Sequence, residues 1–128
     1  MRYNQRMPPS DQTPWVVEFY KDRRGRIPVE DFLNTLPMRE RLEVLRVIDL
    51  LEVYGLALGM PHARPISGMW ELRAGPGRVF YVAVRPPAGR LGRRFILLHG
   101  YRKKSQAAPQ REIETARRRW AELLDQEE

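Results

Sequence analysis

Three short apolar segments in the second half of the chain follow one another with only turn residues between them. Residues 69–74 alternate apolar and charged side chains, and residues 93–101 have a continuous apolar centre. The Gly-Pro-Gly sequence after the first segment predicts a tight turn into residues 78–85, and residues 86–92 predict a second, longer hairpin loop. Because strands joined by short turns pair antiparallel, we expect an antiparallel meander.

The remaining elements are predicted from apolar periodicity and from the positions of proline and glycine. They are a strand at 15–20, helices at 28–36, 38–54 and 109–126, and a loop at 56–68. The sequence therefore predicts an α+β fold, with a small antiparallel sheet of about four strands, two N-terminal helices packed on it and a C-terminal helix. We expect the helices to lie on one face of the sheet.

Length and composition favour one soluble domain. We expect it to span residues 15–128, after a flexible N-terminal arm at 1–14 that has three prolines and no apolar periodicity. The chain has no cysteine, which excludes disulfides and thiolate catalysis. Since it also has no secretory signal and no apolar run of membrane-spanning length, we expect a cytoplasmic protein without a membrane partner.

Positive charge is concentrated in one stretch of the sequence. Residues 65–104 contain nine lysines and arginines and a single acid, Glu71. This imbalance favours a polyanionic partner, nucleic acid above all, over a merely solubilising surface. Metal and cofactor chemistry are not indicated: His62 and His99 are the only histidines, and Gly75-x-Gly77 lacks the third glycine of a phosphate-binding loop.

The predicted strands bring polar side chains together at their ends. Alternation places Glu71 and Arg73 on one face, and the turn returns Arg78 beside Arg73. Four further candidates lie at the end of the last strand: His99, Tyr101, Lys103 and Lys104. Such a cluster suits cleavage of RNA without metal, because cations stabilise the charge on the phosphate while other groups move protons to and from the ribose oxygens.

Each candidate also has a structural interpretation. Glu71 and Arg73 could form only an ion pair, and His99 could be a hydrogen-bonded structural residue in an apolar strand. Tyr101 could lie at the edge of the core, and the two lysines could be solvated charges of a turn. On composition and spacing alone, the chain is a basic α+β domain that binds nucleic acid.

Several segments together resemble a known family. They are Val17-Glu-Phe-Tyr20, Pro28-Val-Glu-Asp-Phe-Leu33, Gly68-Met-Trp-Glu-Leu-Arg73, Arg78-Val-Phe-Tyr81 and Leu97-Leu-His-Gly-Tyr-Arg-Lys-Lys-Ser105, followed by Pro109, Glu112-Ile113 and Ala116. In this order they resemble the HigB-like, phage-derived branch of the RelE/ParE toxin superfamily, over about residues 15–118. The resemblance implies a RelE-like fold and the toxin of a type II toxin–antitoxin pair, whose partner is a cognate helix-turn-helix antitoxin.

The resemblance also implies an activity and a site. Such toxins cleave mRNA on the ribosome without metal and leave a 2′,3′-cyclic phosphate. Arg73 and Arg78 match positions that grip the scissile phosphate, and Tyr101 to Lys104 match the region that supplies an acid and further phosphate contacts. Glu71 and His99 are the candidates for proton transfer, and Arg85, Arg94 and Arg102 are expected to contact RNA.

The chain departs from its relatives at three places, one of which is Tyr101, a position that is often phenylalanine in this branch. Some members of the superfamily have lysine where this chain has Glu71, and relatives with a C-terminal tyrosine end near it, whereas this chain continues into a helix after Pro109. Two other functions are therefore kept beside the nuclease: a non-enzymatic, ParE-like inhibitor of DNA gyrase, and an inactive prophage remnant that acts only with its antitoxin in transcriptional repression.

Overall fold

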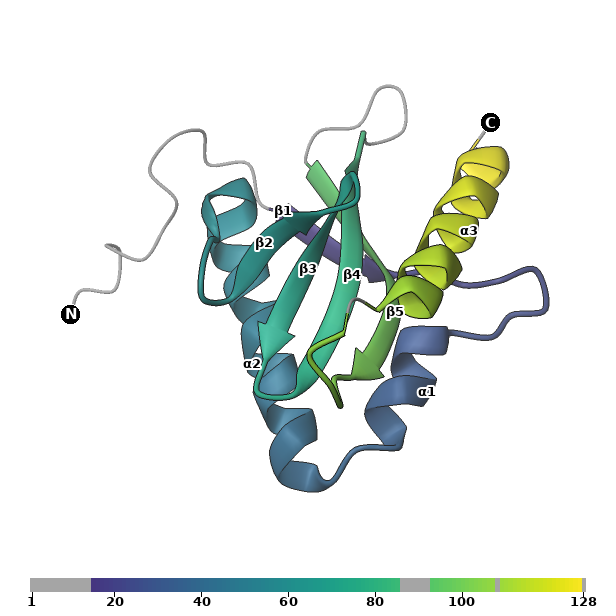
Figure 1. The fold of residues 1–128 in the computed structure, drawn as a ribbon. Coiled ribbons are helices and arrows are strands. Elements are labelled where there is room, and N and C mark those ends of the chain that lie inside the picture. The colour runs from purple at the N-terminus through teal and green to yellow at the C-terminus, as the bar shows by residue number, and fades with distance from the viewer. Residues whose placement is uncertain (1–14, 86–92, 108, 128) are drawn as a thin grey trace.

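A mixed five-stranded sheet forms the centre of the protein. The computed structural model describes residues 15–85, 93–107 and 109–127, so the predicted arm at 1–14 and the loop at 86–92 lie outside the described residues. The strands are β1 (Trp15–Phe19), β2 (Ala63–Ile66), β3 (Met69–Ala74), β4 (Gly77–Val84) and β5 (Arg93–Arg102). Their order across the sheet is β1-β5-β4-β3-β2 (Figure 1).

The helices begin and end close to where proline and glycine place them. They are α1 (Pro28–Asn34), α2 (Met38–Tyr54), a short 3₁₀ helix at Gly55–Ala57 and α3 (Gln110–Glu127). Pro28 occupies the first turn of α1, where no backbone N–H is needed, and Pro37 precedes α2. No helix within the three described ranges is both long and apolar enough to cross a membrane.

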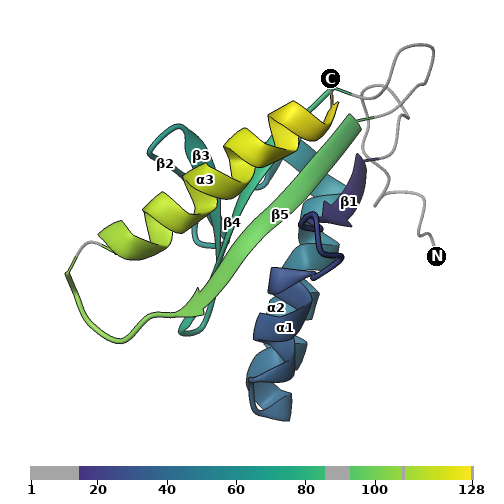
Figure 2. The ribbon, with the colours of Figure 1, turned by 90° about the vertical axis from the view of Figure 1, so that its right-hand side faces the viewer.

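The expectation that the helices pack on one face is wrong. The apolar residues of α1 and α2 form one core with Leu72, Tyr81 and Leu97, whereas α3 packs with Phe80 and Leu98 on the other side of the sheet. Figure 2 shows α3 on one side of β5 and α1 and α2 on the opposite side. The physical reason is that β4 and the centre of β5 are apolar on both faces, so both faces need cover.

Two features of the sheet differ from the predicted antiparallel meander. β1 pairs parallel with β5, from Trp15 opposite Arg93 to Phe19 opposite Leu97, while the other neighbours pair antiparallel as expected. The predicted loop at 56–68 contains β2, which a two-residue turn at Ser67 and Gly68 joins to β3. Both turn residues have positive φ, as such hairpin turns require.

Candidate functional site

The pairing of β3, β4 and β5 places three of the predicted residues in one row. Arg73 lies opposite Arg78, and Arg78 lies opposite Tyr101. Directly opposed residues of an antiparallel ladder share a face, so all three are on the α3 side of the sheet. Lys103 follows two residues after Tyr101, and its backbone N–H donates to the carbonyl of Pro76 in the β3–β4 turn, at 2.8 Å.

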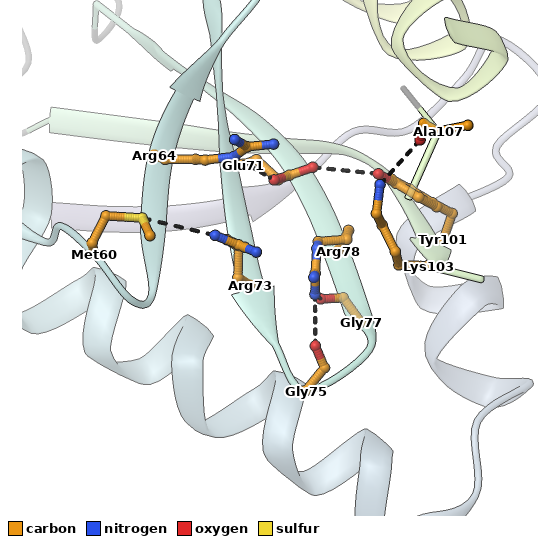
Figure 3. A network of polar contacts seen from close by, with 10 residues as sticks. All are labelled: Met60, Arg64, Glu71, Arg73, Gly75, Gly77, Arg78, Tyr101, Lys103 and Ala107. Atoms are coloured by element: carbon orange, nitrogen blue, oxygen red, sulfur yellow. Dashed lines mark hydrogen bonds and ion pairs between the residues drawn. The ribbon is translucent and has the colours of Figure 1, made fainter. Parts of the chain in front are cut away.

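Glu71 lies beside this row, two residues before Arg73 on the same face of β3, and it is only 1% exposed. Its Oε1 accepts a hydrogen bond from Nε of Arg64 at 3.0 Å, and its Oε2 accepts one from the Tyr101 hydroxyl at 3.3 Å (Figure 3). The ion pair of Glu71 is thus with Arg64 of β2 and not with Arg73. Because both carboxylate oxygens are engaged and shielded from solvent, the geometry favours a positioning role over proton abstraction from a substrate.

Tyr101 keeps its proton at neutral pH. Burial and the adjacent charge of Glu71 raise the pKa of Tyr101 to about 12. One face of its ring stacks near Phe80, with 5.7 Å between the ring centroids. The phenol is therefore held at both ends, by the carboxylate at its hydroxyl and by the core at its ring.

Arg78 braces the β3–β4 turn. It is 9% exposed, and its Nη1 donates to the carbonyls of Gly75 at 2.6 Å and Gly77 at 2.9 Å (Figure 3). Burial, with a smaller contribution from the neighbouring Arg73, lowers the pKa of the Arg78 guanidinium. Arg78 is thus a structural cation of the row, with little surface to offer to a large ligand.

The more accessible cations lie around it. Arg73 is half-buried, and its Nη1 lies 3.9 Å from the sulfur of Met60. Lys103 is also half-buried and donates from Nζ to the carbonyl of Ala107 at 3.2 Å. With Arg64, whose side chain is 43% exposed, these residues surround Glu71 and Tyr101. We call Arg64, Arg73, Arg78 and Lys103 the basic cluster.

His99 lies beside this cluster but faces α3. Nη1 of Arg119 donates to its Nδ1 at 2.8 Å, so Nδ1 carries no proton, and its Nε2–H donates to Oε1 of Glu112 at 2.6 Å. Arg119 also donates to the carbonyl of Leu98 at 3.2 Å. Because both ring nitrogens are occupied, the geometry favours the structural interpretation of His99, as the residue that anchors α3 to β5.

This arrangement predicts a loss of stability in mild acid. Burial, and to a smaller degree the Arg119 charge, lower the pKa of His99 from its ordinary value of 6.5. The unfolded chain therefore binds a proton more readily than the folded one, and the free energy of unfolding should fall as the pH drops below about 6.5. Denaturant unfolding between pH 7.5 and 5 should show this decrease in the free energy of unfolding with falling pH. The slope should be the same in the wild type and in His62→Gln and weaker in His99→Gln. Equal slopes in all three would contradict it.

The three arginines expected to contact RNA are not brought to the basic cluster. Arg102 is on the opposite face, where it forms a two-pronged pair with Glu40 of α2 at 2.9 and 3.0 Å. Arg94 pairs with Glu18 at 2.7 Å, eight residues or about 26 Å along β5 from Arg102. Arg85 is exposed directly after β4 and lies at that same distant end. Lys104 is exposed beyond Lys103.

Arg64 is the residue that the sequence interpretation missed. It lies in the segment that was predicted to be a loop. Ser67-Gly68 is a hairpin-turn signal, and a turn there would have paired Arg64 with Glu71.

No cluster of three or more potential metal ligands occurs among the residues that the structure describes.

A family model matches most of the chain. The model of the family described as "Phage derived protein Gp49-like (DUF891)" matches residues 31–121, most of the chain. The chain belongs to this family. The Gp49-like family is of the RelE-like toxin type, so the broad resemblance is confirmed, and the match spans every residue of the basic cluster. No curated protein matches the chain.

Proposed function

We propose that this Gp49-like protein is the toxin of a type II toxin–antitoxin pair, of the HigB-like kind, and that it cleaves mRNA on the ribosome without metal. The observation that carries the proposal is the row of Arg73, Arg78 and Tyr101 around the buried Glu71. A cationic surface with a fixed, protonated phenol is suited to phosphodiester cleavage by the neighbouring 2′-hydroxyl.

Arg73, Lys103 and Arg64 would stabilise the charge that develops on the scissile phosphate. The planar guanidinium of arginine can hold two phosphate oxygens at once, and Arg64 is already oriented by Glu71. Tyr101, whose hydroxyl donates to Glu71 in the free protein, would turn its proton to the leaving 5′-oxygen, while the attacking 2′-hydroxyl loses its proton to water and water reprotonates Tyr101. Because Glu71 and His99 are both engaged within the protein, the proposal places the main catalytic contribution in charge stabilisation and orientation.

The partners follow from the same proposal. The cognate antitoxin would be a helix-turn-helix protein that binds the toxin and blocks the basic cluster. The formal net charge of +7 favours association with ribosomal RNA, the polyanion on which the substrate is presented.

The proposal predicts that removing two of the half-buried cations of the basic cluster abolishes most of the cleavage. Arg73→Ala/Lys103→Ala should lower transcript cleavage at least a hundredfold, since loss of a single charge-stabilising donor commonly costs about 10²-fold. Transcript 5′ ends would be mapped after induction in bacteria, with and without ribosome stalling. Arg23→Ala/Arg24→Ala removes the same charge from exposed positions outside the cluster and should keep wild-type cleavage.

The outcomes separate the candidate functions. If Arg73→Ala/Lys103→Ala cuts transcripts like the wild type, the proposed site is wrong. Growth arrest with intact transcripts and inhibited supercoiling would identify a gyrase inhibitor instead. Absence of any toxicity would identify the transcriptional repressor.

A further inference from the structure

A pocket of about 640 Å³ lies next to the basic cluster: it is lined by Lys103 of that cluster and by Tyr101, which lies opposite Arg78 in the sheet. Its other walls come from the end of α1 and the turn to α2, from the chain after β5, and from the start of α3. The volume is typical of pockets that hold a small organic ligand. Neither the family assignment nor the proposed chemistry accounts for this pocket.

The lining combines flat apolar surface with positive charge. Phe32, Leu36, Pro37 and the ring of Tyr101 provide the apolar part of the lining. The charged lining residues are four cations, Arg102, Lys103, Lys104 and Arg111, and one acid, Glu112. Glu112 is already engaged by His99, and Arg102 by Glu40, so Lys103, Lys104 and Arg111 determine the charge that a ligand meets. This combination fits a planar ring attached to an anionic group.

Two walls of the pocket are fixed by the core. The Tyr101 hydroxyl is tied to Glu71, which holds the ring in place. Phe32 packs so closely on Gly100 that a side chain there would lie 2.3 Å from the Phe32 ring. A flat ligand can therefore enter between preformed surfaces, and little conformational entropy is lost when it binds.

We propose that this pocket binds one nucleobase of the RNA, in the nucleotide next to the scissile phosphate. The inference rests on the proposed function and adds to it a subsite that places the phosphate on the basic cluster. Since Lys103 belongs to both, and Tyr101 of the pocket lies opposite Arg78 of the cluster, a base stacked in the pocket has its own phosphate within reach of the cluster. Stacking tolerates any base, so the pocket positions the strand more than it reads the sequence.

The test uses RNA that cannot be cleaved. Six fluorescein-labelled 2′-O-methyl hexanucleotides, each with one abasic residue at a different position, would be compared with the intact hexanucleotide by fluorescence anisotropy on the full chain. We expect one abasic position to weaken binding to the wild type about tenfold or more, as loss of a stacked base does. Equal affinity for all seven probes overturns the inference.

Variants locate the effect. Gln110→Trp and Thr35→Trp each place a large ring in the pocket from an exposed position on opposite walls, and both should remove the difference between intact and abasic probes. Ala121→Trp adds the same ring at an exposed position of α3 outside the pocket and should preserve the difference. A base-dependent difference that survives in both pocket variants overturns the inference.

Failure of this inference is distinguishable from failure of the proposed function. If Arg73→Ala/Lys103→Ala abolishes transcript cleavage while the abasic scan is flat, the nuclease stands and the pocket is not a base subsite. An acidic peptide, polyglutamate, tests for a protein ligand. If it displaces the probe from the wild type and Ala121→Trp but not from Gln110→Trp or Thr35→Trp, and if the abasic scan is flat, the pocket binds protein and the inference is wrong.

Discussion

Replacement of Gly55 by alanine is expected to lower the free energy of unfolding by about 3–5 kcal/mol, because strain and steric overlap act at the same residue. Gly55 follows α2 with φ +55° and ψ −132°, a conformation that only glycine adopts without strain. A Cβ at this position would lie 2.0–2.5 Å from atoms of the Trp15 indole. Trp15 in turn stacks on Phe95, with 4.2 Å between centroids, so the indole cannot move without disturbing β1.

Thermal unfolding followed by circular dichroism would measure this effect, with an expected decrease in Tm of about 10 °C or more. Two alanine variants separate the causes. Gly25 has positive φ but open space around it, so Gly25→Ala should cost only the backbone strain. Gly59 has neither positive φ nor a close neighbour, so Gly59→Ala should be nearly neutral. If Gly55→Ala were as stable as Gly25→Ala, the Trp15 indole would be able to move aside without lowering the free energy of unfolding, and the expectation of steric overlap would be wrong.

Replacement of Glu71 is expected to impair stability and cleavage together. Glu71→Ala should cost about 2–4 kcal/mol, below the range for a fully buried pair because Arg64 can turn to solvent. It should also lower transcript cleavage about 10²-fold, since Arg64 and Tyr101 both lose the group that orients them. Denaturant unfolding and mapping of transcript 5′ ends would measure the two losses.

The nearly isosteric Glu71→Gln separates charge from packing. The charge of Glu71 raises the pKa of Tyr101, so this variant should lower it from about 12, while burial, the larger cause, keeps it above the ordinary 10.0. The ultraviolet titration of the phenolate, with Tyr101→Phe as the reference that removes this tyrosine, would show the change. Full cleavage activity in Glu71→Gln together with an unmoved Tyr101 pKa would exclude the positioning role.

The elements with local signals were predictable from the sequence. α2 follows a long apolar period that ends at a glycine. The β3–β4 hairpin follows from the Gly-Pro-Gly sequence, whose first two residues form the turn, so Arg73 and Arg78 were correctly placed together. In that hairpin, the turn fixes which residues face one another, and the side-chain alternation fixes which face they share.

The arrangements that depend on distant contacts were not predictable. Parallel pairing of β1 with β5 joins segments nearly eighty residues apart, and the placement of α3 depends on contacts of His99 that no local pattern reveals. The partner of Glu71 was missed because β2 is four residues long and contains a proline. Arg94 and Arg102 were likewise grouped only because both are basic. They lie near opposite ends of the ten-residue strand β5, so their surroundings differ.

The parallel contact between β1 and β5 also determines when the sheet can be completed during synthesis. β1 has no partner strand until β5 has been synthesised. β5 also contributes Tyr101 to the row that includes Arg73 and Arg78. A chain that ends before β5 therefore has neither a closed sheet nor a complete row. The sheet and the row are completed by one and the same strand, so the proposed nuclease would gain its fold and its site together.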